Sequence, residues 1–358
     1  IHQHPELSFK EFETSKFIQK QQTSWGVEFD TGYVNTGIIA FVKGNNPSSK
    51  VIALRADIDA LPIQEENEFD FASINSGVMH ACGHDVHTSS LLGAIKILQS
   101  IRSEFNGTVK CLFQPAEEIL PGGASLMIEQ GALENPRPDS ILGQHVYPEL
   151  PVGKVGMKSG LYMASTDELH VKIIGKGGHA ALPHTVIDPV LITSHIIVAL
   201  QQIVSRSSKP DMPSVLSFGK VIAEGATNII PEEVNLAGTF RTFDESWRSK
   251  AHEKMIKMAS SIAESMGGSC EFEVRKGYPY LVNDEAVTAQ TKKSAIAYLG
   301  KENVVDLDLR MTAEDFAYYS QIMPGCFYRL GTATPGTQTS GLHTSTFNPD
   351  ERAIEQGM

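Results

Sequence analysis

Short apolar runs alternate with segments of helical spacing in the first half of the chain. Three runs of strand length lie at 51–56, 108–113 and 140–142. Between the first two runs, Leu91 and Ile95 belong to a set of apolar residues with the three- and four-residue spacing of one helix face. Strands that alternate with helices are typical of a mostly parallel sheet with helices on both faces, so the pattern predicts an α/β domain.

The pattern changes near residue 165. Leu169, Val171 and Ile173 alternate with polar residues, which indicates a half-buried strand. Gly267 and Gly268 form a stop signal after an amphipathic helical pattern. After the first strand we predict a helix over 188–204, strands over 214–222 and 234–243, a helix over 245–266 and a strand over 270–274. This βαββαβ order is the ferredoxin-like arrangement, and it describes a complete small domain.

The α/β pattern returns after Tyr278, with helices expected over 286–299 and 314–322 and a strand over 326–330. A chain of 358 residues also exceeds the ~250–300 residues at which single cores stop growing. We therefore predict one discontinuous α/β domain, 1–164 and 278–358, built on a mostly parallel mixed sheet flanked by helices. The ferredoxin-like domain, 165–277, is inserted into it.

Composition and charge narrow the classes of function. The formal charge of −12 argues against nucleic acid or an anionic membrane surface as a partner. We expect no membrane span of ~18–20 residues, because His195 and polar neighbours interrupt the most apolar segment. The four cysteines fit no disulfide framework. Cys82 is expected to act as a free thiolate, which suits a reducing, cytoplasmic compartment.

Acidic residues and a histidine follow the predicted strands of the first domain. Asp57 follows the first strand and His145 the third. The adjacent residues Glu117 and Glu118 follow the second. Ligands of open α/β sheets bind outside the carboxyl ends of the strands, so we expect these side chains at one edge. Adjacent glutamates cannot both point the same way, so one can bind metal while the other serves as a base.

The segment HACGHDVH at 80–87 concentrates metal-type residues just before a predicted helix. Its Cys82 and His84 are candidate ligands. His87 lies four residues before Leu91 on one helix face, so we expect it to pack in the core instead. Taken singly, a histidine at a sheet edge is more often a surface residue, and only the conjunction of these elements indicates a site.

Thiolate, imidazole and carboxylate together suit Zn²⁺ or another borderline divalent ion. The candidate ligands are Cys82, His84, Glu118, His145 and His343. Five ligands exceed the three protein ligands of a tetrahedral catalytic site, so a pair of ions that share a bridging ligand accounts better for the number.

Seven motifs, in this order, resemble those of a known family. They are RADIDALP, HACGHDVHTS, FQPAEE, GQHV, GKGGHAALPH, NIIP and LHTSTF. They are similar to motifs of the aminoacylase and carboxypeptidase superfamily, in the branch of hippurate hydrolase, N-acetyldiaminopimelate deacetylase and indole-acetyl-amino-acid hydrolase. The similarity runs from IHQHPELSF at residue 1 to HTSTFNPDE near the end. It implies a large catalytic domain interrupted by a smaller lid or dimerisation domain.

The resemblance implies a role for each site residue. Glu117 matches the general base, and Asp57 matches the acid that orients the metal site. Arg55 stands where other branches carry histidine. Because of this difference the resemblance does not identify the metal, which we expect to be Zn²⁺ or Mn²⁺, with Ni²⁺ or Co²⁺ as further options. The ligands of the two divalent ions are matched by Cys82, His84, Glu118, His145 and His343.

The inserted domain also carries matches to the family. His179 matches a lid histidine that stabilises the oxyanion, in some relatives from the neighbouring subunit. Asn228 and Arg241 match substrate-binding positions, and an arginine fork is a natural partner for a carboxylate. Without the resemblance, these would be a surface histidine, a turn residue and a strand-face charge. The resemblance further implies a homodimer formed through the lid.

We therefore expect metal-dependent hydrolysis of an N-acyl amino acid, with an acetyl, benzoyl or similar acyl group, to a carboxylate and a free amino acid. A dipeptidase or carboxypeptidase with the same site is the alternative, because the motifs do not separate the two. A non-catalytic binding protein of the same fold is an alternative from another class. The presence of all the ligands and of the base argues against it.

Overall fold

The computed structural model describes residues 1–337 and 340–358, which form two compact units. Unit 1 comprises Ile1–Tyr162, Val282–Leu309 and Glu314–Met358, and unit 2 comprises Met163–Leu281 and Arg310–Ala313. These boundaries differ by a few residues from the predicted domain boundaries, which were 164/165 and 277/278. The assignment of Arg310–Ala313 to unit 2 was not expected from the sequence.

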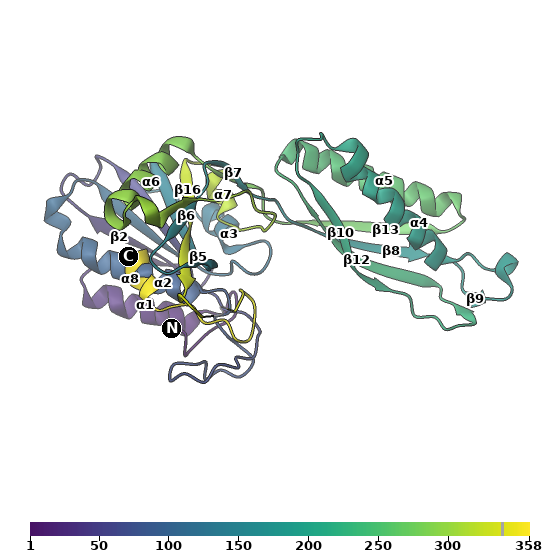
Figure 1. Cartoon of the computed structure of the whole chain (residues 1–358), viewed down its shortest axis with the longest axis horizontal. Helices are drawn as coiled ribbons and strands as arrows, with labels where there is room; N and C mark the ends of the chain where they lie inside the picture. Colours follow the sequence, from purple (N-terminus) through teal and green to yellow (C-terminus); the bar gives the residue numbers. More distant parts are fainter. Residues whose placement is uncertain (338–339) are drawn as a thin grey trace. The chain divides into compact units, whose positions relative to one another are not determined.

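The core of unit 1 is an eight-stranded mixed sheet in the order β1-β2-β4-β3-β5-β16-β6-β15. Figure 1 labels β2, β5, β6 and β16 of this sheet. Its strands are β1 (Glu28–Tyr33), β2 (Gly37–Lys43), β3 (Val51–Asp57), β4 (Thr108–Gln114), β5 (Ser140–Pro151), β6 (Val155–Met157), β15 (Val304–Asp306) and β16 (Gly325–Ala333). β3 runs parallel to β4 and β5, and β5 runs parallel to β16. Antiparallel pairs join β1 to β2, β2 to β4 and β16 to β6. The predicted α/β class with a large mixed sheet is confirmed.

Helices flank this sheet, and apolar side chains hold them there. The helices are α1 (Phe12–Ser24), α2 (His84–Ser100), α3 (Gly123–Glu129), α6 (Glu285–Leu299), α7 (Ala317–Ser320) and α8 (Arg352–Gly357). Leu91 and Ile95 of α2 share a buried cluster with Phe113 of β4. The helix predicted over 314–322 is shorter, because Glu314 and Asp315 precede α7. A separate two-stranded sheet pairs β7 (Gly160–Met163) with β14 (Leu281–Asn283).

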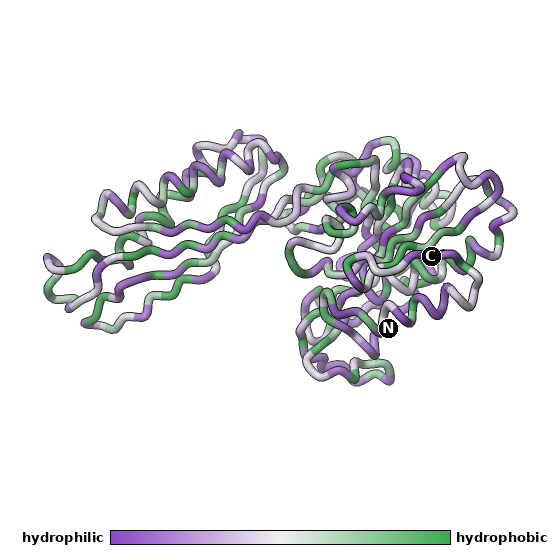
Figure 2. The backbone as a smooth tube through the Cα atoms, turned by 180° about the vertical axis from the view of Figure 1, so that it is seen from behind, coloured by the Kyte–Doolittle hydropathy of each residue, from purple (hydrophilic) through white to green (hydrophobic). Residues whose placement is uncertain are grey.

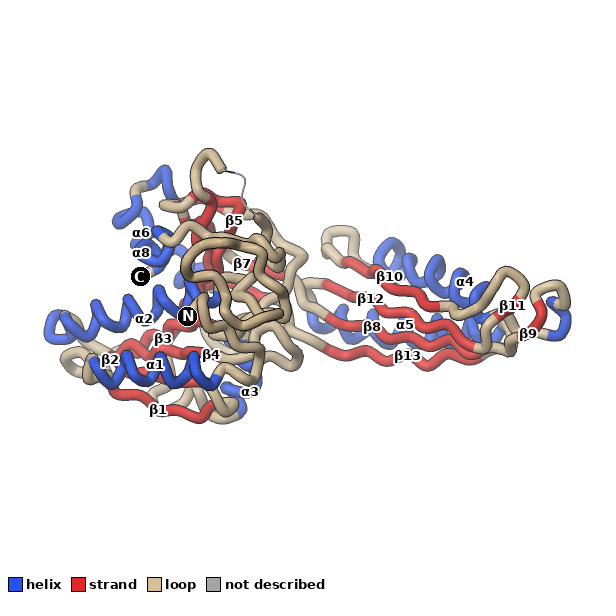
Figure 3. Tube along the Cα trace, turned by 90° about the horizontal axis from the view of Figure 1, so that it is seen from below, coloured by secondary structure: helices blue, strands red, loops and turns tan. Residues whose placement is uncertain are grey.

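Unit 2 is a four-stranded antiparallel sheet with two helices on one face (Figure 3). Its main elements are β8 (Asp167–Ile174), α4 (Pro189–Gln202), β10 (Val215–Ile222), β12 (Glu233–Arg241), α5 (Glu245–Ser265) and β13 (Ser269–Lys276). They follow the predicted βαββαβ order, and the sheet order is β10-β12-β8-β13. Asp188 and Asp244 accept hydrogen bonds from first-turn N–H groups of α4 and α5, which explains where these helices begin.

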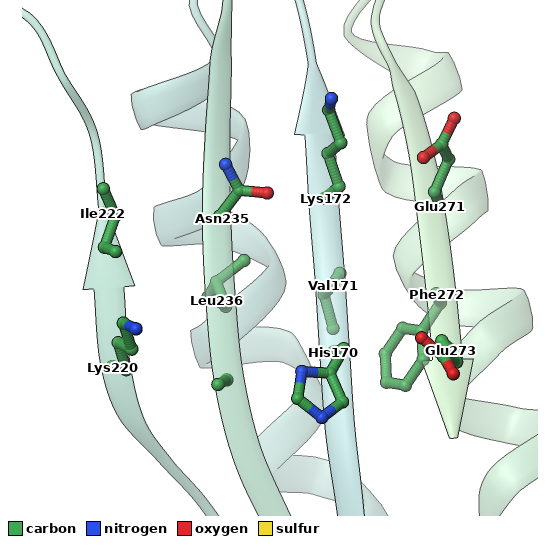
Figure 4. Close-up of a pocket in the computed structure, with 11 residues that line it drawn as sticks. His170, Val171, Lys172, Lys220, Ile222, Asn235, Leu236, Glu271, Phe272 and Glu273 are labelled. Carbon is green, nitrogen blue, oxygen red and sulfur yellow. The ribbon is translucent and has the colours of Figure 1, made fainter. Parts of the chain in front are cut away.

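The two faces of the unit 2 sheet differ in polarity, as the alternating colours along its strands show (Figure 2). Leu169, Val171 and Ile173 pack toward α4 and α5. The opposite face carries a shallow hollow of about 400 Å³ (Figure 4). Its lining includes His170, Lys172, Lys220, Asn235, Glu271 and Glu273. None of the described residues that line this hollow was predicted to bind metal or substrate or to act in catalysis, so the hollow is not the predicted active site.

One expectation about unit 2 is corrected. Pro189–Ser207 is long and apolar enough to cross a membrane, with a mean hydropathy of 1.2 in its most apolar window, although no such stretch was expected. Ile192 and Ile196 pack into the core of unit 2, while Val198 is 74% exposed. A helix that packs on a sheet passes the same test of length and composition, so the stretch is weak evidence for a membrane.

Candidate metal centre

A tight turn before α2 brings Cys82 and His84 beside β5. Gly83 has φ +79°, and a Cβ there would lie 2.5 Å from Val146 Cγ2. Only glycine therefore fits between the two residues. Val146 follows His145 on β5, so this close approach also brings His145 to Cys82. The Cys82 Sγ and the His145 Nε2 are 3.4 Å apart.

Five side chains from four segments converge at this point. The Cys82 Sγ is 3.3 Å from the His343 Nε2. That nitrogen lies 3.2 Å from the Glu118 Oε1, which in turn lies 3.9 Å from the His84 Nε2. The structure thus brings together all five predicted ligands. Cys82 belongs to two groups with donor atoms within 4.8 Å of one another, Cys82, His84 and His145, and Cys82, Glu118 and His343, and a further group joins His84 and Glu118 to Glu117.

Two of the imidazoles are held from behind, with Nε2 facing the centre. The Asp59 Oδ1 lies 3.0 Å from the His84 Nδ1. The Val146 carbonyl accepts from the His145 Nδ1 at 2.8 Å, and because a carbonyl only accepts, the His145 Nε2 presents a lone pair. Partners of this kind are typical of histidines that bind metal.

Two donor atoms at the centre are left without hydrogen bonds. Within residues 1–337 and 340–358, the His84 Nε2 and the Glu118 Oε1 are buried and make no well-oriented hydrogen bond, although the Glu118 Oε1 lies 3.2 Å from the His343 Nε2. Buried polar atoms are normally satisfied, and a cation between these two atoms would satisfy both. The residues present therefore fit divalent cations.

His343 is the most exposed member of the centre, with 52% of its side chain accessible. It has φ +61°, which is uncommon for a residue other than glycine. Its N–H donates to the Ala81 carbonyl at 2.8 Å, next to Cys82. This backbone contact places a residue from the end of the chain beside the start of α2.

Buried polar contacts support the centre on the side of β3. Asp57 Oδ2 accepts from the Arg55 Nη1, and Asp57 Oδ1 accepts from the His87 Nδ1, both at 2.5 Å. The His87 Nε2 accepts from the Val146 N–H at 2.8 Å. His87 is buried on α2 as expected, and it also links Asp57 to the strand of His145. Asp57 Oδ2 also lies 3.7 Å from the His84 Nε2.

Glu117 lies among buried carboxylates that the sequence analysis missed. Glu117, Glu314 and Asp315 offer oxygens within 4.8 Å of one another. The Asp315 N–H donates to the Glu117 Oε1 at 3.4 Å. The sequence did contain a sign of this cluster, because Glu314 and Asp315 form an adjacent acidic pair like Glu117 and Glu118. We expected that pair to lie in a helix.

Electrostatics at the centre favour added positive charge. Burial, with the Glu314 and Glu118 carboxylates, raises the pKa of Glu117 well above its usual range. Burial and the Glu118 carboxylate likewise raise the pKa of the Cys82 thiol well above its usual range. A coordinated divalent cation acts in the opposite direction, because it deprotonates a thiol outright.

The three predicted residues of unit 2 do not lie together. His179 and Asn228 are neighbours, since His179 on β9 (Gly178–His179) pairs with Ile229 on β11 (Ile229–Ile230). Both are exposed. Arg241 is the last residue of β12, whereas His179 and Asn228 lie beyond the first residue of β12. Eight residues of strand span roughly 26 Å, which exceeds the length of a small substrate.

Arg241 is half-buried, and its Nη1 is a buried atom without a hydrogen-bond partner among the described residues. A guanidinium in this state is able to receive an anion. His179, by contrast, accepts a hydrogen bond at Nδ1 from the Ala181 N–H at 3.1 Å, which leaves Nε2 as its outward atom.

A mixed α/β sheet that presents thiol, imidazole and carboxylate donors around one centre is typical of metal-dependent hydrolases. The chain belongs to peptidase family M20/M25/M40, whose model matches residues 53–358. This confirms the superfamily predicted from the seven motifs.

Relatives in this family cover nearly the whole chain. An N-acetyl-L-cysteine deacetylase of Bacillus subtilis is 40% identical over 354 residues, 99% of this chain and 83% of the relative. An N-acyl-L-amino acid amidohydrolase of Geobacillus stearothermophilus is 44% identical over 283 residues, 79% of this chain and 76% of the relative. A solved Bacillus subtilis structure, a dinuclear metal-binding peptidase of the M20 family, matches with TM-score 0.83 and 39% identity, covering 99% of this chain and 92% of that one.

Proposed function

We propose that this protein is a metal-dependent amidohydrolase that cleaves N-acyl amino acids to a carboxylate and a free amino acid. The observation that carries the proposal is the convergence of five donor side chains beside Glu117, with two donor atoms left unsatisfied. The names of the two relatives, a deacetylase and an N-acyl amino acid amidohydrolase, support the substrate class.

The donor set supports two divalent ions that share Cys82. One would be held with His84 and His145, and the other with Glu118 and His343. Such a pair would lower the pKa of a bound water toward ~7 and polarise the amide carbonyl. Zn²⁺ and Mn²⁺ are the proposed ions, with Ni²⁺ or Co²⁺ as alternatives, because the thiolate favours a thiophilic ion while carboxylate and imidazole also accept Mn²⁺.

Glu117 acts as the general base in the proposed reaction. It takes a proton from the attacking water and later passes that proton to the nitrogen of the leaving amine. Burial and the neighbouring carboxylates raise the pKa of Glu117 above that of an ordinary glutamate, which favours its uptake of a proton from the water. Asp57 keeps the site oriented through its contacts with Arg55 and His87.

Unit 2, with its ferredoxin-like order of elements, is proposed as the lid. His179 would stabilise the oxyanion, an effect worth ~3–4 kcal/mol per donor. Arg241 and Asn228 would hold the amino acid portion. Since Arg241 lies at the opposite end of β12 from Asn228 and His179, one chain cannot supply all three to one small substrate. We therefore propose a homodimer in which His179 and Asn228 act on the partner's site.

Unit 2 has surfaces suited to such a dimer. β10 is an edge strand of the sheet, and Val221 and Ile222 on it are exposed. The outer face of α4 exposes Val190, Leu191 and Val198. An open strand edge beside an apolar helix face is a typical site for pairing with a second copy.

Mixing two inactive variants tests the shared site. His179→Ala and Glu117→Gln proteins should each be nearly inactive. Hybrid dimers, formed by mixing after mild dissociation, should regain activity, because one of the two sites then has both residues intact. No recovery in hybrids verified by mass would contradict the exchange of His179 between subunits.

A substrate panel with added Mn²⁺, Zn²⁺ or Co²⁺ tests the proposed reaction. We expect turnover of N-acetyl amino acids or hippurate, measured as release of free amine. Faster cleavage of dipeptides would favour a dipeptidase with the same site. No hydrolysis with any ion would contradict an enzymatic role. The free thiol at Cys82 suits a reducing compartment, so we place the enzyme in the cytoplasm.

A further inference from the structure

We propose that Glu11 is a positioning residue for Glu117, through the backbone of Ala116. This inference rests on the proposed role of Glu117 as the general base. Glu11 lies just before α1, more than one hundred residues away in the sequence, and is fully buried in unit 1. It belongs to no group of potential metal donors among the described residues.

The carboxylate of Glu11 joins three separate segments. Its Oε1 accepts from the Phe9 N–H and from the Ala116 N–H, each at 2.9 Å. Its Oε2 accepts from the Thr36 Oγ1 at 2.8 Å. Glu11 thus fixes the backbone of the residue immediately before Glu117.

The two backbone N–H groups on Oε1 belong to residues in the left-handed region. Phe9 has φ +65° and Ala116 has φ +54°. A residue other than glycine keeps this conformation only when its surroundings hold it there. The Ala116 dihedral angles set the direction in which the chain enters Glu117, so the hydrogen bond to Glu11 determines where the base points.

A second carboxylate holds the other side of Glu117. The Glu118 N–H donates to the Asp59 Oδ2 at 3.0 Å, and the Ser8 Oγ donates to the same oxygen at 2.7 Å. The N–H groups on both sides of Glu117 therefore end on buried carboxylates, and both carboxylates are tied to residues 8–11.

The hydrogen bonds of Glu11 do not require its negative charge. Burial, with the nearby Asp59 carboxylate, raises the pKa of Glu11 to about 7. A glutamine of the same shape can accept from Phe9 and Ala116 through its carbonyl oxygen, and its amide can donate to the Thr36 hydroxyl. An alanine loses all three contacts.

Glu11→Ala and Glu11→Gln separate positioning from a purely structural role. We expect Glu11→Ala to lower kcat by ~10–100-fold, the size of effect that a small misplacement of a catalytic group produces. KM and the number of ions per chain should stay near the wild-type values, because the donor side chains remain. Glu11→Gln should keep kcat within about threefold of wild type, since it retains the hydrogen bonds.

Lys110→Met is the matched control. The Lys110 Nζ is held by the carbonyls of Glu134 and Pro136 at 2.6 and 3.1 Å, so the variant also removes a buried charged group from unit 1. It should lower Tm while kcat is unchanged, which shows that loss of stability alone does not reduce turnover.

Four results would overturn the inference. They are unchanged kcat in Glu11→Ala, a loss of activity that follows loss of ions, equal damage in Glu11→Gln, and an equal fall of kcat in Lys110→Met. Glu117→Gln, measured alongside, separates the two proposals. If it keeps normal turnover, the proposed role of Glu117 as the base fails; if it is inactive while Glu11→Ala is fully active, only the role of Glu11 fails.

Discussion

Each unit contains a buried arginine surrounded by acids, but the two clusters differ in charge balance. In unit 2, Arg248 donates to Asp167 through Nε at 3.0 Å and Nη2 at 2.6 Å, and to the carbonyls of Thr166 and Gly277. Asp167 also contacts the His252 Nε2 at 2.7 Å. The bidentate pair is complete without any added ion.

In unit 1, one guanidinium faces three carboxylates. Arg55 contacts Asp57 at 2.5 Å, Asp315 at 2.6 Å and Glu314 at 3.0 Å, with Glu117 close by. The excess of negative charge continues into the donor cluster, where buried atoms are left unsatisfied. The comparison teaches that a balanced buried cluster stabilises the fold, whereas an unbalanced one indicates a site for cations.

Removal of the base should give the largest effect on the unit 1 cluster. Glu117→Gln should lower kcat by ~10²–10⁴-fold, the usual contribution of general acid–base catalysis. Metal content should persist, and Tm should not fall, because the variant removes one of several repelling carboxylates. Kinetics, metal analysis and calorimetry check these outcomes. Near-normal turnover in a folded variant would rule out Glu117 as the base.

Disruption of the balanced cluster in unit 2 should instead cost stability. Arg248→Met removes the bidentate partner of buried Asp167 and leaves His252 as its remaining charged contact, which should lower the free energy of unfolding by up to ~3–5 kcal/mol. Urea titration measures the loss, and metal analysis of the folded protein should show unchanged occupancy. The double variant with Asp167→Asn is the control and should recover part of the loss. Wild-type stability in Arg248→Met would remove the contrast between the clusters.

Loss of the most exposed ligand should weaken one ion of the pair. His343→Ala should lower the affinity for that ion by at least ~10-fold, or about 1.4 kcal/mol, while the other group keeps its donors. Dialysis against a chelator followed by metal analysis checks the result. Two ions still tightly bound would show that His343 is not a ligand.

Acid should reveal the smallest difference, in unit 2. Hydrogen bonds and ion pairs with His252 and Arg248 outweigh the effect of burial and hold the pKa of Asp167 below its ordinary value of 3.8. Its contribution to stability is thus complete above pH 3.8 and is lost as pH falls through the lower folded-state pKa. Compared with wild type, Asp167→Asn should show less loss of stability below that pH in acid titrations of unfolding. Parallel acid profiles would contradict this linkage.

Local patterns in the sequence predict most of the fold. The alternation of Leu169, Val171 and Ile173 and the stop signal at Gly267 and Gly268 predict elements of unit 2 within a residue or two. The return of Arg310–Ala313 to unit 2 escaped prediction, because it depends on contacts between distant segments rather than on periodicity.

The donor residues could also be predicted from the sequence, because each follows a strand or begins a helix. The side-chain contacts that support them could not be predicted. Arg55 contacts Asp315, which lies 260 positions away in the sequence. The spacing of His87 identifies it only as a core residue, whereas the structure shows that its ring nitrogens also form hydrogen bonds with Asp57 and Val146. Side-chain hydrogen bonds of this kind leave no periodic signal.

The place of β16 in the sheet affects how the protein is made. β16 inserts between β5 and β6, although the whole of unit 2 is synthesised after those strands and before β16. At ~5–20 residues per second, a ribosome needs roughly 9 to 35 seconds to travel from the end of β5 to the start of β16. Throughout that interval the nascent chain carries an open strand edge, which is a template for aggregation. We expect unit 2 to fold on the ribosome before β16 closes the sheet of unit 1.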